Sequence, residues 1–347
     1  MDTGIEIRGI HRQVMSCRKM EAKLTNDSQI NSRAQMPPAQ PSEPAGPSRQ
    51  LRNFGLASLG LVLCFAIPLW DLGWFAATSE FHSYILLIPF ISAYLVWLKK
   101  VSFPICSQPA RKAASVFLTA GTLVIIAYWL FFRSRLKLME DDYLAVMMIS
   151  FLLFFVGICG LFLGRELLRA TAFPLGLLIF MVPIPAAAMP AIDAFLQHGS
   201  AAAAQGFFTL SGTPYLRSGL AFQLSDINIL VARECSGIQS SMVLLITGLV
   251  AAYLFLRKPW NRALMALLMI PLGLLRNGFR VFTIGELCVH LGPQMINSPI
   301  HHRGGPIFFA LSLIPLFILL LVLQKSERAR VKARSHAGAN ANPKPPE

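Results

Sequence analysis

Long apolar blocks separated by short polar loops constrain the fold of this sequence more than any other feature. A helix needs about 20 predominantly apolar residues to cross the hydrocarbon core of a bilayer. Hydrophobic residues make up 54% of the 347 residues and charged residues only 14%, whereas soluble domains carry about 25% charged residues. The sequence therefore predicts an all-α integral membrane protein with about eight transmembrane helices. The candidate spans lie at about 53–70, 84–98, 113–132, 144–164, 170–190, 236–256, 263–280 and 304–324.

Two of these blocks are irregular. The block at 84–98 is shorter than a typical span. The block at 170–190 contains Pro183, Pro185 and Pro190 near its end. Because proline lacks a backbone N–H and clashes with the preceding turn, these residues should kink or stop the helix there.

The blocks divide the chain into three segments. Residues 1–52 are polar and include a stretch rich in proline and serine, which predicts a disordered cytoplasmic tail. Residues 53–324 form the transmembrane domain, and residues 325–347 form a basic cytoplasmic tail.

The net charge of +14 does not indicate nucleic-acid binding, because of where the basic residues lie. Most of them are in the two tails and in alternate short loops such as 99–112 and 257–262. Lys and Arg accumulate in cytoplasmic loops, so this pattern predicts that both termini are cytoplasmic. The long stretch 191–234 has only Arg217 and Arg233 and is predicted to lie outside the cytoplasm.

Part of this outer stretch has the alternation of a strand. Apolar and polar residues alternate in places between residues 207 and 233, and Ser211-Gly212-Thr213-Pro214 is a turn signal. We expect a short strand pair or β-hairpin in a small extracytoplasmic region.

Cys235 is the cysteine whose position favours chemistry. It lies in Arg233-Glu234-Cys235-Ser236-Gly237, at the outer start of the sixth block. A thiol attacks as the thiolate, which the partial positive charge and free N–H groups of a helix N-terminus stabilise. The N–H groups of Ser236 and Gly237 could also bind an oxyanion. Taken alone, Cys235 is more typical of a small residue at a helix entry than of a nucleophile.

Basic side chains are predicted at the same membrane face as Cys235. Arg276 and Arg280 end the seventh block with the i,i+4 spacing that puts both on one helix face. His301 and His302 precede the eighth block. Histidine is the usual base beside a nucleophilic cysteine, and an arginine can bind a carboxylate or stabilise an oxyanion. The alternatives are snorkelling arginine anchors and interfacial histidines.

The order of these motifs resembles the exosortase/archaeosortase family. The resemblance rests on Glu234-Cys235-Ser236-Gly237-Ile238, then Asn277-Gly278-Phe279-Arg280, then His301 followed four residues later by Gly305. It covers residues 53–324 and includes Phe81-His82-Ser83 as a weaker feature. By this resemblance Cys235 is the nucleophile, Arg280 the arginine and His301 the histidine of the site, with the spacing to Gly305 favouring His301 over His302.

The resemblance also implies a substrate class and a location. Family members act in the bacterial inner membrane on exported proteins that end in a short motif, a transmembrane helix and a basic cluster. They are thought to cut at the motif and to transfer the new carboxyl end to a surface acceptor. The implied fold is a helical membrane bundle unrelated to Gram-positive sortases, and no cofactor or metal is implied.

Two other functions remain open at this level. The chain could be a multi-spanning transporter, or a non-enzymatic membrane component of a surface polysaccharide export system. A transporter should have ionisable residues in mid-span and broken helices. The centres of the predicted spans are almost free of charge, with Glu286 the main exception.

Overall fold

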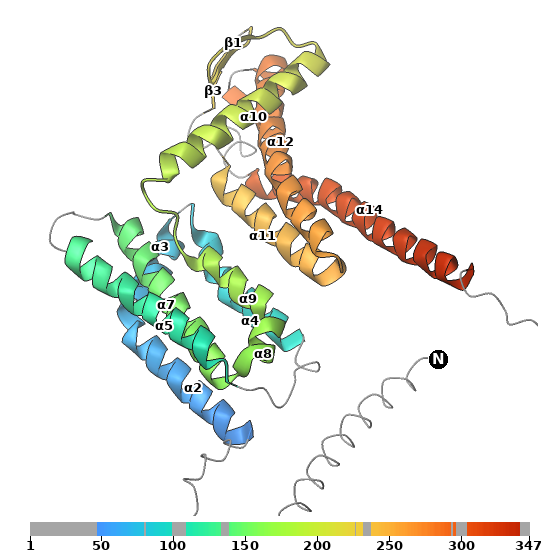
Figure 1. Cartoon of the computed structure of the whole chain (residues 1–347). Helices are drawn as coiled ribbons and strands as arrows, with labels where there is room; N and C mark the ends of the chain where they lie inside the picture. Colours follow the sequence, from blue (N-terminus) through green and yellow to red (C-terminus); the bar gives the residue numbers. More distant parts are fainter. Residues whose placement is uncertain are drawn as a thin grey trace, which may run out of the picture. The chain divides into compact units, whose positions relative to one another are not determined.

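The computed structural model of the chain is almost entirely helical, with one small sheet (Figure 1). It describes residues 47–79, 81–98, 109–132, 139–225, 227–231, 237–292, 294–295 and 304–340. The elements are α2 (Pro47–Cys64), α3 (Ala66–Thr78), η2 (Ser83–Leu87), α4 (Ile88–Leu98), α5 (Arg111–Ala127), η4 (Tyr128–Phe132), α7 (Glu140–Phe162), α8 (Gly164–Ala170), α9 (Ala172–Leu177), η5 (Leu178–Met181), α10 (Met189–Ser211), β1 (Leu216–Ser218), β2 (Ala221–Gln223), β3 (Asn228–Leu230), α11 (Ile238–Phe255), α12 (Pro259–Leu291) and α14 (Gly305–Asn340).

The described helices include five that are long and apolar enough to cross a membrane, or six if α2 and α3 form one bent span. These two helices meet at an angle of 68°. The five are residues 111–130, 140–162, 238–255, 259–291 and 305–330. The predicted number of eight is therefore not confirmed, although the class of helical membrane protein is.

The two irregular blocks account for this difference. Residues 83–98 form a short apolar helix. In the block predicted at 170–190, helical structure stops at Met181, before Pro183 and Pro185. Pro190 instead lies in the first turn of α10, where its missing N–H costs no hydrogen bond. The prolines thus stop the helix as expected, and the apolar helix that they leave, residues 172–181, is too short for a regular span.

Helix α10 is the element that the sequence pattern did not predict, because residues 191–234 were expected to form an outer loop. It packs against α12, and small residues bring the two backbones together. A Cβ added at Gly278 of α12 would lie 2.5 Å from Ala203 Cβ and 2.8 Å from Ala204 N. A Cβ at Gly285 would lie 2.6 Å from the Phe208 ring. The buried face of α10 combines small residues such as Ser200, Ala201 and Ala204 with the larger Met189, Leu196 and Phe208.

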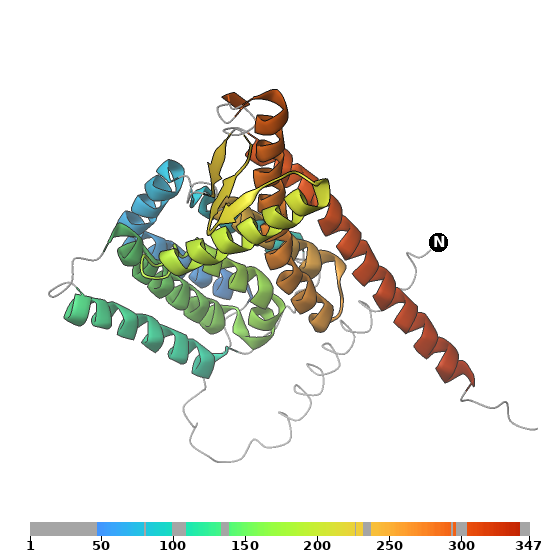
Figure 2. The same ribbon diagram turned by 90° about the horizontal axis from the view of Figure 1, so that it is seen from above.

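The small sheet packs on α10 and α12 (Figures 1 and 2). Three short antiparallel strands have the order β1-β2-β3, with Arg217 opposite Phe222 and Phe222 opposite Ile229. Phe222 is fully buried with Phe208 of α10. The turn signal expected at residues 211–214 belongs instead to the end of α10, where Gly212 takes a left-handed conformation with φ 77°.

Helix α11 joins the two main apolar cores. On one side Ile246 and Tyr253 pack with residues of α3, α4, α7 and α9, and the Tyr253 ring stacks on Phe173 at 4.0 Å between centroids. On the other side Leu244 and Ala252 pack with α12 and α14. Helix α11, which follows the predicted nucleophile in sequence, is therefore held from both sides along its length.

Candidate active site

The start of α11 lies directly against α12. Gly237 precedes the helix in a left-handed conformation with φ 70°. A Cβ added to it would lie 2.8 Å from Asn277 Oδ1 and 3.0 Å from Arg276 Nη2. Both the backbone angle and this close approach require glycine. Gly237, which belongs to the motif of Cys235, therefore lies against Asn277, which belongs to the motif of Arg280.

Arg276 is buried at this contact, with only 8% of its surface exposed. Its Nη2 donates to Ser240 Oγ, and Ser240 Oγ donates to the Gly237 carbonyl at 3.1 Å. Arg276 Nη1 has no hydrogen-bond partner among the described residues. The guanidinium therefore holds the first turn of α11 through Ser240.

Asn277 and Gly278 fix α12 to α10. Asn277 is 1% exposed and donates through Nδ2 to Ser200 Oγ at 3.0 Å. Gly278 lies against the α10 backbone, since an added Cβ would be 2.9 Å from the Ser200 carbonyl oxygen. These two residues of the Asn-Gly-Phe-Arg motif therefore have a clear packing role: they set the position of α12 between α10 and α11.

Arg280 lies one helical turn after Arg276 and is partly buried. Phe279, beside it, makes an edge-to-face contact with Phe308 of α14, with ring centroids 6.3 Å apart. Helix α14 begins just before Phe308, and the Gly304 carbonyl accepts from Phe308 N at 3.1 Å. The start of α14, which follows the two histidines in sequence, thus contacts α12 beside Arg280.

Three predicted residues lie outside the described part of the chain: Cys235, His301 and His302. Their roles, and the choice between the two histidines, stay predictions. The structure does place the residues that flank them. Gly237 contacts Asn277 and Arg276, and Phe308 contacts Phe279, so both flanking segments meet the same two turns of α12.

The Phe81-His82-Ser83 segment also reaches the start of α11. Ser83 Oγ accepts a hydrogen bond of 2.6 Å from Gln239 Nε2, and Phe81 packs against a cluster that includes Ile238. His82 is 2% exposed, and its Nδ1 lies 3.0 Å from Ser79 Oγ. Burial lowers the pKa of His82, and the charge of Asp141 opposes this shift. The sequence indicated this segment only through the resemblance.

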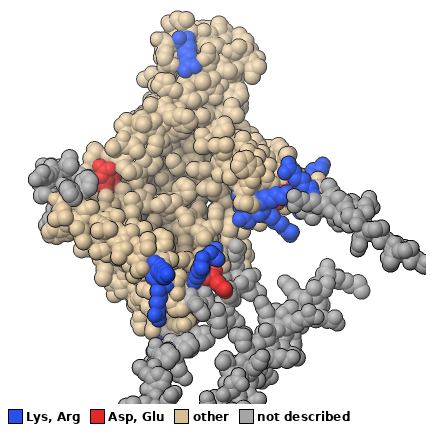
Figure 3. All heavy atoms as spheres, viewed as in Figure 1, with Lys and Arg blue, Asp and Glu red and all other residues tan. Residues whose placement is uncertain are grey.

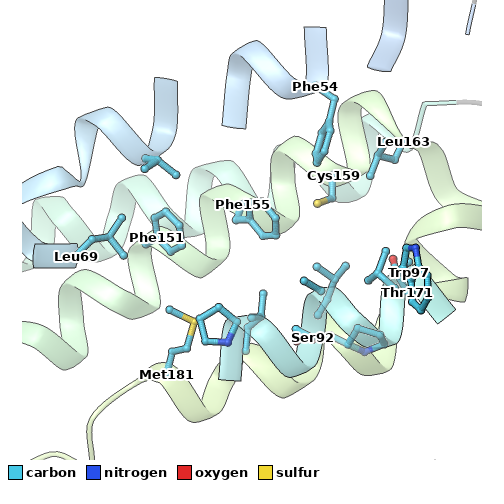
Figure 4. Close-up of a pocket in the computed structure, with 17 residues that line it drawn as sticks. Phe54, Leu69, Ser92, Trp97, Phe151, Phe155, Cys159, Leu163, Thr171 and Met181 are labelled. Atoms are coloured by element: carbon cyan, nitrogen blue, oxygen red, sulfur yellow. Dashed lines mark hydrogen bonds between the residues drawn. The ribbon is translucent and has the colours of Figure 1, made fainter. Parts of the chain in front are cut away.

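A separate apolar pocket of about 620 Å³ shares no lining residue with this site. Figure 4 shows the Cys159 thiol among aromatic and aliphatic side chains such as Phe151 and Phe155. The hydroxyl groups at its wall are already bonded, Ser92 to the Pro174 carbonyl at 2.6 Å and Thr171 to Leu167 at 2.8 Å. The pocket offers no acid or base for catalysis.

The comparison with known families agrees with the resemblance. Residues 74–318 match the family model described as transmembrane exosortase. The chain belongs to this exosortase family. The match runs from α3 into α14 and contains every motif described above. No curated protein and no solved structure matches the chain.

Membership supports a general role as a membrane transpeptidase, with exported proteins as the substrate class. Within the described residues, no group of three or more His, Cys, Asp or Glu could hold a metal ion.

Proposed function

We propose that this exosortase is a cysteine transpeptidase that cleaves the C-terminal sorting signal of exported proteins on the extracytoplasmic face and transfers them to a surface acceptor. The observation that carries the proposal is the contact of Gly237 with Arg276 and Asn277. It joins the motif of the predicted nucleophile to the motif of the predicted arginine, although about 40 residues separate them in sequence. Family membership also favours this reading over the transporter alternative.

Chain connectivity limits how far the predicted residues can lie from this contact. An extended chain spans at most about 3.6 Å per residue, so the Cα of Cys235 lies within about 7 Å of the Gly237 Cα. By the same rule the Cα of His301 lies within about 11 Å of the Gly304 Cα. The flanking residues therefore support a common site near Arg280.

The proposed reaction has two steps. Cys235 Sγ, activated by His301, attacks the scissile carbonyl carbon, and Arg280 stabilises the negative oxygen that forms. The C–N bond then breaks, the leaving amine takes the proton from His301, and a thioester to Cys235 remains. In the second step the acceptor nucleophile attacks this thioester and releases the thiol. Arg276, bonded to Ser240, would keep the first turn of α11 in place throughout.

The proposed orientation follows the distribution of charge. Ala110 N donates to the Gly160 carbonyl at 2.9 Å, so the basic start of α5 lies beside the end of α7. The other end of α7 begins with Glu140, Asp141 and Asp142, but Arg133, Arg135 and Lys137 precede them in sequence, so this loop is the exception to the charge pattern. The orientation rests on the basic loops at 99–112, 165–169 and 257–262 and on the two tails. We infer cytoplasmic termini and an extracytoplasmic site in the inner membrane. Reporter fusions after Arg257 should read cytoplasmic, and fusions near Thr213 should read external; the reverse pattern would contradict the proposal.

The processing activity can be tested by co-expression with a tailed substrate. The chain is produced with an exported protein that ends in a short motif, a transmembrane helix and a basic cluster, and tail loss is measured by mass. Cys235→Ala should abolish tail loss, whereas Cys288→Ala, which alters a buried thiol of α12, should retain it. His301→Ala should be inactive and His302→Ala active. Normal processing by Cys235→Ala at equal membrane levels would overturn the proposal.

A further inference from the structure

A buried carboxylate lies among basic residues where α11, α12 and α14 meet, at the end of α11 away from Gly237. Glu327 of α14 is 6% exposed. Its Oε2 accepts from Arg257 N at 3.0 Å, and its Oε1 accepts from Lys258 N and Asn261 Nδ2, both at 2.9 Å. The carboxylate thus binds the α11–α12 loop through backbone and amide N–H groups and fixes the direction in which the loop side chains leave.

The basic side chains at this corner are left available for a ligand. Arg257, Lys258 and Arg328 line a cavity of about 540 Å³ together with Glu327, whose charge interacts with that of Lys258. Among the described residues no acidic oxygen lies within ion-pair distance of these three basic side chains, so the cavity keeps a net positive charge. Figure 3 shows Lys and Arg atoms gathered where the described part of α14 ends. Arg262, in contrast, is engaged: its Nε donates to the Leu256 carbonyl at 2.9 Å, and it stacks over Tyr253.

An apolar groove continues from this basic cavity. It has a volume of about 500 Å³ and is lined by α4, α11 and Phe317 of α14. Leu254 and Phe255 line both cavities, so the two form one continuous surface. Phe317 and Phe255 are half exposed there, at 50% and 51%. A charged cavity at the end of an apolar groove is the complement of an amphiphile with an anionic head.

We propose that this combined surface binds one anionic glycerophospholipid, with its phosphate on Arg257, Lys258 and Arg328 and an acyl chain in the groove along α11. Basic pockets between transmembrane helices are a known way to bind anionic lipid headgroups. The same positive rim would repel a peptide with a basic tail. The lipid would pack against α4, α11 and α14 at the end opposite the proposed active site, so the inference does not depend on the transpeptidase chemistry.

Binding can be measured on the purified full-length protein in a neutral detergent by native mass spectrometry. Short-chain phosphatidylglycerol is compared with phosphatidylcholine of the same chains and with glycerophosphoglycerol, the headgroup alone. The test variant is Arg257→Gln/Lys258→Gln/Arg328→Gln. The matched control, Lys112→Gln/Arg165→Gln/Arg169→Gln, also removes three positive charges, all from exposed side chains outside this cavity.

Phosphatidylglycerol should bind at least about tenfold more tightly than phosphatidylcholine to the native chain and to the control variant. The test variant should lose this preference. Equal binding of the two lipids, or an equal loss in the control variant, would overturn the proposal. Headgroup binding as tight as lipid binding would also overturn it, because the groove would then contribute nothing. The expected lipid preference does not depend on processing, so it should remain even if the chain shows no Cys235-dependent processing.

Discussion

Gly237 offers a direct test of the contact between α11 and α12. Gly237→Ala adds a Cβ at a left-handed φ of 70°, which costs about 1–2 kcal/mol for an L-residue. The same Cβ would lie 2.8 Å from Asn277 Oδ1. Asn277 cannot move aside easily, because it is 1% exposed and bonded to Ser200. Overpacking of this kind adds about 1–3 kcal/mol, so the total loss of stability should be about 2–5 kcal/mol.

Gly212 is the matched control for this substitution. It has a similar φ of 77°, and a Cβ added there meets nothing within 4 Å. Gly212→Ala should therefore cost only the conformational strain, about 1–2 kcal/mol. The difference between the two variants isolates the contact with α12.

Both variants can be unfolded with SDS from detergent micelles, with tryptophan fluorescence as the readout, and tested for substrate tail loss. Gly237→Ala should be the less stable of the two by about 1–3 kcal/mol. It should also lose processing, because the residues after Cys235 are displaced from Arg276. Equal stability of the two alanine variants would refute the reasoning, as would normal processing by Gly237→Ala.

Three further predictions concern α12 and His82. Gly278→Ala should lower stability by about 1–3 kcal/mol in the same SDS assay, because its Cβ meets the α10 backbone at Ala204 N. Gly206→Ala is the control: it has open space around it and should be neutral or slightly stabilising. Burial lowers the pKa of His82 below its ordinary value of 6.5, so the unfolded chain binds a proton that the folded chain does not. Stability should therefore fall as the pH drops from about 7 to 5, and His82→Phe should weaken that dependence; an unchanged pH profile would exclude His82 as its source. Arg280→Lys should reduce the processing rate by about 10²–10³, because lysine keeps the charge but not the planar fork; a native rate would exclude that role.

The sequence predicted the helical membrane class because hydrophobic blocks of span length are a strong signal. It also predicted the stop near Pro183 and Pro185. Helix α10 was not predicted in this way, because small and polar residues such as Ser200 and Ala204 separate its apolar residues and no continuous apolar block marks the helix. The predicted number of eight spans is not confirmed, because hydropathy identifies apolar blocks but not whether the helix that forms is long enough to cross the membrane.

At the candidate site, the sequence could predict that Arg276 and Arg280 share a helix face, but not how the surroundings of the two side chains differ. The i,i+4 spacing of Arg276 and Arg280 indicated one helix face. It could not show that Arg276 is buried and bonded to Ser240 while Arg280 lies a turn further on. The conformation of Gly237 depends on the close approach of α12, which lies far away in sequence. His82 gave only a weak signal because its burial depends on the neighbouring Phe75 and Tyr84 rings.

The central claim is that Cys235 forms a covalent intermediate with the substrate. The purified full-length protein can be incubated with a tailed substrate without an acceptor, quenched in acid and digested for peptide mass analysis. The account predicts a hydroxylamine-sensitive adduct on the peptide that contains Cys235, with the mass of the substrate segment before the cut. An adduct on Cys64 or Cys288 instead, or tail release by Cys235→Ala at the native rate, would contradict it.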